Sequence, residues 1–557
     1  MTEKAEECNG FKALYLAALD SNVSLITGVP GYPINSLMKL FLDKTIEEGG
    51  AESRTVILRA SHSDKMRSSA YSARWLTNEK VAFEIALGAS ISGKRSLVIV
   101  KHVGMNILSD PLITSVTHTI GAGLVIIVGD DPGAKGSQNE QDSRWYGRIA
   151  EIVVFDPADP DTAYRALRRA YELSEETRTP IILRVTQSFG KNEGKIKRLP
   201  RSSSIPPEFD RSIWKSQMVV KHQLFHSTVY PLMETEAEDT DLNRTILMPE
   251  KKTKYSLGSR SIGIISSGFT SSIVEKILKK RDIDCEISHL SLNLVNPLPI
   301  RKIGTFLRDN QILLVAEESE PFIEEQIRIA GRVRGKKTGH LPYGQIMPEY
   351  IEFALEHIDE EEISKSTYTV FSKLSTEGRV TICEDCPYLP LYQFLSTINV
   401  WIAGDLGCSV RSAPEPLAAV DVSFALGSAI SVACGFDKKG IAVIGDFALA
   451  HSGILGLLNA VTFGCDVLVL VLQNDVAAMT GGQEAPDIRK LVEIITSDVS
   501  VFNIDEGKRL EKIETEKEIG SKIKEQSLNP VLSELIQTKL ALPGISVIYL
   551  KGKCRKY

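Results

Sequence analysis

The segment Val443–Asp475, VIGDFALAHSGILGLLNAVTFGCDVLVLVLQND, constrains the fold more than any other part of this chain. It reads as an apolar strand ending at Gly445-Asp446, a helical stretch, and a second apolar strand ending at Asn474. A strand–helix–strand unit with a parallel return is a right-handed βαβ crossover, which places both strand ends at the same edge of the sheet. We therefore expect Asp446 and Asn474 to lie together at the edge where open α/β sheets bind ligands.

The residue types at this edge suit a metal-bound diphosphate. Gly445 permits a tight turn, and a helix predicted to begin near Ser452 would direct unpaired N–H groups toward an anion. A carboxylate and an amide oxygen beside phosphate oxygens are typical Mg²⁺ ligands. The spacing alone leaves an equal alternative, an ordinary βαβ unit with Asp and Asn in its turns.

The rest of the chain predicts an α/β protein with parallel sheets covered by helices. Continuous apolar runs alternate with helical patterns, as expected for strands buried on both faces. Five such runs precede residue 190: SLITGVPG, RSLVIVKH, GLVIIVGDDPG, AEIVVFDP and PIILRVTQ. The predicted organisation is a first α/β domain at 1–190, a polar linker with one docked helix at 191–258, a smaller α/β domain at 259–358 and a third at 375–557.

Composition excludes several protein classes. The 557 residues are 43% hydrophobic and carry a net charge of -6, so no basic field predicts nucleic-acid binding. No run of 18 uncharged apolar residues predicts a membrane span, and the acidic N-terminus MTEKAEECNG is not a secretory signal. Eight cysteines in a chain of this length predict thiols or ligands, not a disulfide framework, and indicate the cytoplasm.

Several long motifs resemble one family. They are HSGILGLLNAV with VLQNDVAAMTGGQE, NEKVAFEIALGASISGKRSLVIVKHVGMNILSDPL, DDPGAKGSQNEQDSRWYGR, and NPLP with EESEPFIEEQ. Together they resemble the α subunit of indolepyruvate ferredoxin oxidoreductase, in the 2-oxoacid:ferredoxin oxidoreductase superfamily of thiamine-diphosphate enzymes. The resemblance covers nearly the whole chain. It implies a pyrimidine-binding domain, a transketolase C-terminal-like domain and a diphosphate-binding domain, in that order.

The resemblance assigns roles to individual residues. Glu79 matches the glutamate that hydrogen-bonds the aminopyrimidine N1′, which enables the 4′-amino group to remove the thiazolium C2 proton. Without the family, a helix N-terminal Glu would be the simpler interpretation, and Glu84 is the neighbouring carboxylate. Mg²⁺ would be held by Asp446, Asn474 and the carbonyl of Val476. The implied cofactor-binding residues are Gly28, Pro30, Gly31, Gly445, Asp446, Ser452, Asn474, Val476, Thr480 and Gly481.

The substrate region departs from the family pattern. Tyr32 stands in the glycine-rich turn GVPGYPINSL where most relatives carry Thr, and its hydroxyl lies farther out. Phe447 follows the Gly-Asp pair where small residues are usual. His102 and Asn106, in KHVGMN, are substrate candidates, with ordinary hydrogen-bonded loop residues as the equal alternative.

Four cysteines match the ligands of the family's proximal cluster. Cys383 and Cys386 form a C-x-x-C pair that alone could bind zinc, act in redox chemistry or occur by chance. With Cys408 and Cys554 they resemble the four thiolates of a 4Fe–4S cluster, and zinc is the rival occupant.

The implied reaction is oxidative decarboxylation of an aryl pyruvate such as indolepyruvate, with coenzyme A receiving the acyl group and ferredoxin the electrons. A smaller β subunit and a dimer of heterodimers are implied. The family's cysteine-rich ferredoxin-like domain would begin where this sequence stops, so the external electron path is expected to be shortened or supplied by another polypeptide. Two alternatives remain: a non-redox 2-oxoacid decarboxylase or carboligase, and a subunit that has lost catalysis.

Overall fold

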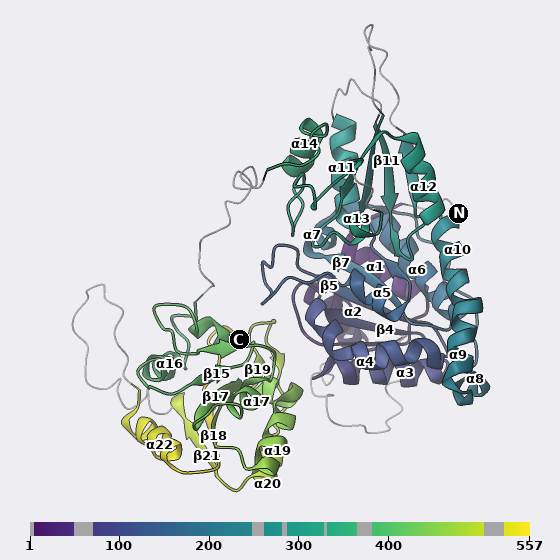
Figure 1. Ribbon diagram of the computed structural model, residues 1–557. Coiled ribbons are helices and arrows are strands. Elements are labelled where there is room, and N and C mark those ends of the chain that lie inside the picture. The colour runs from purple at the N-terminus through teal and green to yellow at the C-terminus, as the bar shows by residue number, and fades with distance from the viewer. Residues whose placement is uncertain are drawn as a thin grey trace. The chain divides into compact units, whose positions relative to one another are not determined.

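The computed structural model describes residues 5–49, 71–247, 261–280, 287–327, 331–364, 381–505 and 528–557. The chain divides into two compact units, Met1–Leu374 and Ser375–Tyr557, which we treat separately (Figure 1). Three mainly parallel sheets carry the structure, two in the first unit and one in the second. The predicted α/β class with helix-covered parallel sheets is confirmed. The division into three domains with a linker stays a prediction.

The largest sheet of the first unit has seven strands. Its order is β12 (Leu294–Asn296), β6 (Val154–Phe155), β7 (Ile181–Thr186), β5 (Leu124–Asp130), β4 (Ser96–Lys101), β2 (Leu25–Gly28) and β3 (Ser72–Trp75). All pairs are parallel except β12 with β6. Strands β2, β5 and β7 are buried along their whole length, which explains their continuous apolar runs.

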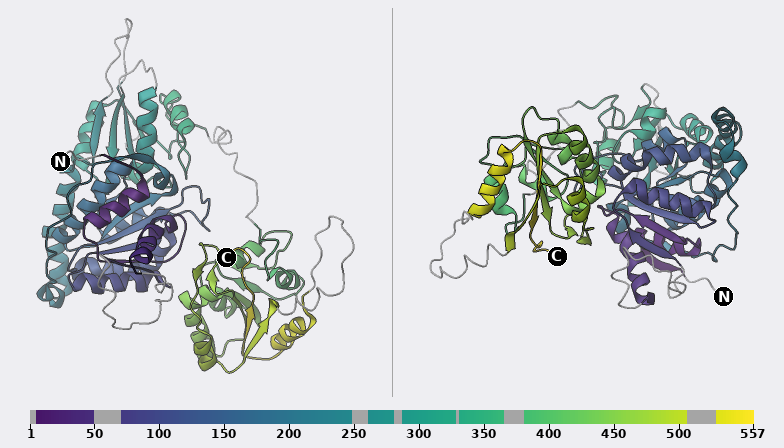
Figure 2. Two further views of the ribbon diagram at one scale, coloured as in Figure 1. Left: turned by 180° about the vertical axis from the view of Figure 1, so that it is seen from behind. Right: turned by 90° about the horizontal axis from the view of Figure 1, so that it is seen from below.

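Helices cover both faces of this sheet (Figures 1 and 2). One face carries α1 (Gly10–Asp20), α2 (Asn35–Gly49) and α6 (Pro160–Thr177), and the other carries α3 (Glu79–Ile91), α4 (His102–His118) and α5 (Arg144–Ala150). Helix α7 (Gln187–Lys191) follows β7. This arrangement follows from right-handed crossovers that run toward opposite edges of the sheet.

The predicted linker, 191–258, is more structured than expected. It contains α8 (Arg211–Lys215), α9 (Met218–Leu224), the π-turn η3 (Phe225–Val229) and α10 (Tyr230–Asp239). Strand β8 (Glu193–Ile196) pairs with β1 (Glu6–Asn9). The polar composition hid the apolar side chains Phe225, Met233 and Ala237, which are buried in the core of the first unit. Residues 248–258 lie outside the described part of the chain.

A five-stranded sheet completes the first unit. Its order is β14 (Val333–Arg334), β13 (Ile312–Ala316), β10 (Ile262–Ser267), β11 (Ile287–Leu292) and β9 (Arg244–Leu247), with only β9 antiparallel. Its helices are α11 (Gly268–Lys280), α12 (Ile300–Asp309), α13 (Phe322–Ile327) and α14 (Pro348–Glu356). Because β12 lies between β11 and α12 in sequence but joins the seven-stranded sheet, the two sheets are interlocked.

The second unit is built on a six-stranded parallel sheet. Its order is β16 (Val422–Ser423), β15 (Ile402–Gly404), β17 (Gly440–Gly445), β18 (Val467–Gln473), β22 (Ile545–Lys551) and β21 (Val499–Asn503). One face carries α17 (Ala429–Ala433), α19 (Ile454–Phe463) and α20 (Arg489–Ile495), and the other carries α16 (Leu389–Leu395) and α22 (Pro530–Ala541) (Figure 1). The short hairpin of β19 (Val476–Ala477) and β20 (Gln483–Glu484) follows β18.

Among the described residues, one helix has the length and composition of a membrane span. It runs Asp446–Phe463, with a mean hydropathy of 1.2, and 44% of it is buried. It is the crossover between β17 and β18, and Leu457 and Ala460 are packed in the core of the second unit. A crossover helix that is buried along one face accounts for part of this composition.

Candidate active site

Strand order singles out one crevice in each sheet. In open α/β sheets, ligands bind outside the carboxyl ends of two neighbouring strands whose connections leave in opposite directions. Those neighbours are β2 and β4 in the seven-stranded sheet, β10 and β13 in the five-stranded sheet, and β15 and β17 in the second unit.

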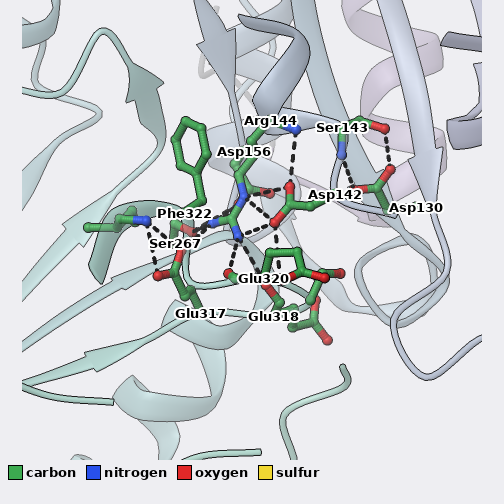
Figure 3. Close-up of polar contacts among 12 residues, drawn as sticks. Asp130, Asp142, Ser143, Arg144, Asp156, Ser267, Glu317, Glu318, Glu320 and Phe322 are labelled. Atoms are coloured by element: carbon green, nitrogen blue, oxygen red, sulfur yellow. Dashed lines mark hydrogen bonds and ion pairs between the residues drawn. The ribbon is translucent and has the colours of Figure 1, made fainter. Parts of the chain in front are cut away.

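The crevice between β10 and β13 is filled by protein side chains. Arg144, the first residue of α5, enters it and donates to Ser267 Oγ (3.1 Å) and Glu317 Oε2 (2.8 Å) (Figure 3). Its other N–H groups reach the Asp142 carboxylate and the carbonyls of Glu318 and Glu320. Every guanidinium nitrogen is therefore in use, and this crevice holds the two sheets of the first unit together.

A second arginine and an unusual carboxyl complete this network. Arg184 donates to Asp130 Oδ2 (2.6 Å) and pairs with Asp156 (3.2 Å). Glu318 is 2% exposed, and neither carboxyl oxygen has a hydrogen-bond partner among the described residues. Burial raises the pKa of Glu318 to about 7, although Arg184 and Lys336 oppose the rise. Burial likewise lowers the pKa of Lys336 to about 8.

The predicted metal ligands lie at the carboxyl ends of β17 and β18, next to the crevice between β15 and β17. The Asp446 Oδ2 accepts from the backbone N–H groups of Asn474 (3.0 Å) and Asp475 (2.6 Å), and its Oδ1 accepts from Phe447 N (2.8 Å). Asn474 Oδ1 accepts from Val476 N at 3.1 Å. The structure therefore brings Asp446 and Asn474 together at adjacent strand ends, as the βαβ pattern predicted.

The charged form of Asp446 is destabilised by its surroundings. It is 7% exposed, and burial raises its pKa to about 6. The Asp475 carboxylate adds to the rise, whereas the three N–H groups oppose it. A pocket opens beside it, lined by Asp446, Leu449, Gln473, Asp475, Pro486, Asp487, Ile488 and Tyr549. A buried carboxylate whose charged form is destabilised in this way would be stabilised by a bound cation.

The predicted helix start near Ser452 is wrong. The helix begins directly after β17 as α18 (Asp446–Ala448), continues through the π-helical segment η5 (Leu449–Gly453) and ends with α19 (Ile454–Phe463). Gly445 has extended backbone and leads straight into the helix, so no loop separates strand from helix. Ser452 instead donates to the carbonyl of Leu426 (2.8 Å), and Phe447 is half-buried.

The other predicted residues of this unit form a turn. Thr480 Oγ1 donates to Gln483 Oε1 (2.9 Å), and Gly481 adopts a φ of 122°, which favours glycine. They lie in the hairpin that starts at Val476. Sequence reasoning missed Asp405, which is 1% exposed and follows β15. Its Oδ1 accepts from Ser409 Oγ (2.5 Å), and Asp405 lies in the motif GDLGC that ends at Cys408, which carried the signal.

In the crevice between β2 and β4, Glu79 occupies the first position of α3. Asn78 caps the helix through Lys80 N (2.9 Å), and Glu79 is 5% exposed. A Cβ at Gly104 would lie 2.7 Å from Glu79 Cγ, so the glycine makes room for this carboxylate. Gly28, Pro30 and Gly31 form the buried turn after β2.

The substrate candidates lie beside this turn. The Tyr32 ring packs on Gly136, where a Cβ would lie 3.0 Å from ring carbons, and burial raises the pKa of Tyr32. His102 is fully buried, with Nε2 3.1 Å from Asn139 Oδ1. Asn106 is exposed, one helical turn later, and hydrogen-bonds Gln141 and Tyr146. Their roles stay predictions.

Sequence reasoning also missed Lys101, the last residue of β4. Its Nζ donates to Gln138 Oε1 at 2.9 Å. Burial lowers its pKa to about 8, while the Asp131 and Glu79 carboxylates oppose that shift. A lysine in KHVGMN next to two quoted candidates was visible in the sequence, but only the strand order places it at the crevice.

The four cysteines approach one another in the second unit. Cys386 N donates to the Cys383 carbonyl (3.1 Å), and Tyr388 OH donates to the carbonyls of Leu550 (3.2 Å) and Gly552 (3.0 Å), which ties this segment to the strand end before Cys554. Burial and the neighbouring thiols Cys383 and Cys554 raise the pKa of Cys386 to about 11.

The pKa of the Cys408 thiol is also raised. Burial, together with Cys386 and Cys554, raises its pKa to about 12. Across the described ranges, however, no three or more His, Cys, Asp or Glu side chains are arranged to hold a metal ion. The expected convergence of Glu79 with Asp446 joins two separately described units and stays a prediction.

Known proteins match this chain in sequence. Residues 405–530 match the family described as thiamine pyrophosphate enzyme, C-terminal TPP binding domain. The indolepyruvate oxidoreductase subunit IorA of Archaeoglobus fulgidus is 27% identical over 501 residues, covering 86% of this chain and 76% of that protein. The same subunit of Methanothermobacter marburgensis is 28% identical over 506 residues, covering 86% and 76%. Among solved structures, the 2-oxoglutarate:ferredoxin oxidoreductase of Magnetococcus marinus has a TM-score of 0.49 at 14% identity, covering 64% of this chain and 66% of that one.

Proposed function

This chain is a relative of the indolepyruvate oxidoreductase subunits IorA, and we propose that it is itself a thiamine-diphosphate-dependent 2-oxoacid oxidoreductase subunit. The finer proposal is oxidative decarboxylation of an aryl pyruvate such as indolepyruvate to an acyl-coenzyme A, with ferredoxin as electron acceptor. A smaller β subunit completes the enzyme, as a dimer of heterodimers in the cytoplasm. Similarity over 86% of the chain supports the coarse activity.

One observation carries the proposal. Buried Asp446, at the end of β17, accepts hydrogen bonds from the backbone N–H groups that follow β18, next to the crevice between β15 and β17. The site fits Mg²⁺, because Asp446 needs positive charge and Asn474 supplies a neutral oxygen. Mg²⁺ binds through few protein ligands and completes its coordination with phosphate oxygens and water, so a site with fewer than three acidic side chains can hold it. Thiamine diphosphate, when bound, supplies the carbon nucleophile for decarboxylation. Asp446, Asn474 and the carbonyl of Val476 would hold its metal.

Glu79 is the proposed acid–base residue. It lies at the crevice between β2 and β4, buried against Gly104, so its carboxyl is held in place and shielded from water. A carboxylic acid so placed can share a proton with a ring nitrogen. The turn Gly28–Gly31 and the side chains of Tyr32, His102 and Asn106 would surround the reacting groups.

The thiols Cys383, Cys386, Cys408 and Cys554 support an iron–sulfur cluster. Cys383 and Cys554 lie near enough to raise the pKa of Cys386, and Cys386 and Cys554 raise that of Cys408. Ligation to a metal would remove the protons that the Cys386 and Cys408 thiols retain. A 4Fe–4S cluster, when bound, accepts electrons one at a time. The second candidate function is a non-redox 2-oxoacid decarboxylase or carboligase. The aromatic side chain of Tyr32 in the substrate turn, which packs on Gly136, favours it.

The deciding experiment measures iron, thiamine diphosphate and Mg²⁺ in the full chain, co-expressed with the β subunit and purified without oxygen. We expect about four irons per chain and a reduced-cluster EPR signal that Cys386→Ser abolishes. Cys434→Ser is the matched control, since Cys434 is a half-buried thiol that packs with the core and is not one of the four.

Thiamine diphosphate without iron would leave the non-redox activity. A chain that binds neither group would overturn the proposed function and indicate a catalytically diverged subunit. Zinc in place of iron would overturn the electron path alone.

A further inference from the structure

Lys101 occupies a defined position at the crevice between β2 and β4. It ends β4, next to β2, where the connections of the sheet diverge. A Cβ on Gly31 would lie 2.6 Å from Lys101 Cδ and 2.8 Å from Cγ, so the lysine stem lies against the turn that carries Tyr32. Gln138 Oε1 accepts from its Nζ at 2.9 Å. The ammonium group is therefore fixed at the strand end.

The surrounding protein compensates the charge of Lys101 only in part. Burial lowers its pKa to about 8, despite the attraction of Asp131 and Glu79. The Lys101 ammonium donates to Gln138 Oε1, which is a neutral amide oxygen. Asp131 Oδ2 is already bonded to Gly136 N (2.7 Å). A small anion in this crevice would supply charge that the protein does not.

The neighbours of Lys101 favour a planar monoanion. Tyr32 packs on Gly136 through the base of its ring, and Gln138 lies two residues farther along the same loop, so the Tyr32 ring, the Lys101 ammonium and the Gln138 amide lie beside one loop. We propose that the Lys101 ammonium binds the carboxylate of the 2-oxoacid substrate, a role that rests on the proposed function. Lys101 thereby selects 2-oxoacids over the corresponding aldehydes and amides.

The expected kinetic effect follows from the chemistry of that carboxylate. It leaves as uncharged CO₂, so its attraction to Lys101 weakens as the reaction proceeds. Lys101 therefore contributes to binding of the ground state, and its loss should raise KM more than it lowers kcat. A merely structural lysine would not produce this separation.

The first test compares Lys101→Met, Lys101→Arg and Lys80→Met in the loaded enzyme with its β subunit. Lys101→Met should raise KM for the aryl pyruvate about 10- to 100-fold, the value of one charged hydrogen bond, with kcat within about threefold. Lys101→Arg should recover most of the loss. Lys80 is the matched control, because it follows Glu79 on α3 but is exposed and paired with Glu84 and Asp110.

The pH profile sharpens the test. In the natural chain KM should climb above about pH 8 as Lys101 loses its proton, and Lys101→Arg should remove this rise because arginine stays charged. An unchanged KM and profile in Lys101→Met would overturn the inference. So would an effect confined to thiamine-diphosphate affinity, which would place Lys101 at the cofactor.

A second measurement needs no turnover. Acetic anhydride labelling of the cofactor-free full chain, read by mass spectrometry against pH, reports the titration of Lys101. Oxamate, an unreactive 2-oxoacid analogue, should shift this titration to higher pH, since a bound anion stabilises the ammonium. If oxamate shifts it while the enzyme oxidises no 2-oxoacid, the proposed function fails and the anion site stands. If turnover occurs without either Lys101 effect, the inference fails alone.

Discussion

Two crevices of the first unit occupy the same topological position and are filled in opposite ways. The crevice between β10 and β13 holds Arg144, whose N–H groups are all bonded to protein oxygens. The crevice between β2 and β4 holds Lys101, whose charge is compensated in part. Both lie where a sheet of this class binds ligands.

The difference shows that strand order locates a possible site, whereas side chains decide its use. Arg144 comes from α5, which packs on the neighbouring seven-stranded sheet, and its guanidinium bonds Ser267 and Glu317, so that crevice is structural. Gly31 and Gly104 instead keep space for Lys101 and Glu79 at the other crevice. A substitution in one crevice should therefore affect stability, and a substitution in the other should affect chemistry.

The largest expected effect is on stability, from Arg144→Met. Removing this guanidinium leaves the buried Asp142 and Glu317 carboxylates without their closest cation, which should cost about 3–5 kcal/mol in the free energy of unfolding of the first unit. Hydrogen exchange of the β10 and β13 amides in urea measures it. Arg165→Met is the control, since that arginine on α6 is 34% exposed and should change stability by less than about 1 kcal/mol. Equal effects of both variants would contradict the structural role of the filled crevice.

Glu79→Gln should have the opposite pattern, with stability nearly unchanged and activity greatly reduced. The amide is similar in size and fits beside Gly104, so the free energy of unfolding should change by less than about 1 kcal/mol. Turnover, and exchange of the C2 proton of bound thiamine diphosphate, should fall at least about 100-fold, because the amide cannot share the required proton. Glu84→Gln is the matched control, an exposed carboxylate five residues later on the same helix. An active Glu79→Gln enzyme would remove Glu79 from the chemistry.

The sequence predicted those parts of the site that depend on local pattern. Asp446 and Asn474 meet because both end strands of one βαβ unit, and apolar runs marked the buried strands. Lys101 and Asp405 were missed because their importance depends on which strands are neighbours, which single-strand patterns do not encode. The helix start was misplaced because Ser452 resembles a helix cap, whereas the chain turns directly from β17 into the helix. The overall polar composition of residues 191–258 predicted a mostly unstructured linker, although a few of this segment's apolar side chains are buried in the core of the first unit.

The smallest expected effect, Glu318→Gln, tests whether the filled crevice is as well compensated as its arginines indicate. Glu318 is the exception there, because both of its oxygens lack partners in the described part of the chain and its pKa is about 7. Between about pH 4.5 and 7 an unfolded chain ionises Glu318 while the folded chain keeps it protonated, so the natural protein loses stability as the pH rises through this window. Glutamine does not ionise. The variant should therefore match the natural protein near pH 4.5 and exceed its unfolding free energy by about 2–3 kcal/mol near pH 7.5, measured by hydrogen exchange of β13. Glu352→Gln, at an exposed position of α14, should not change the pH dependence. If Glu318→Gln and the natural protein vary with pH in parallel, then Glu318 is already ionised and compensated, and the filled crevice contains no uncompensated carboxyl.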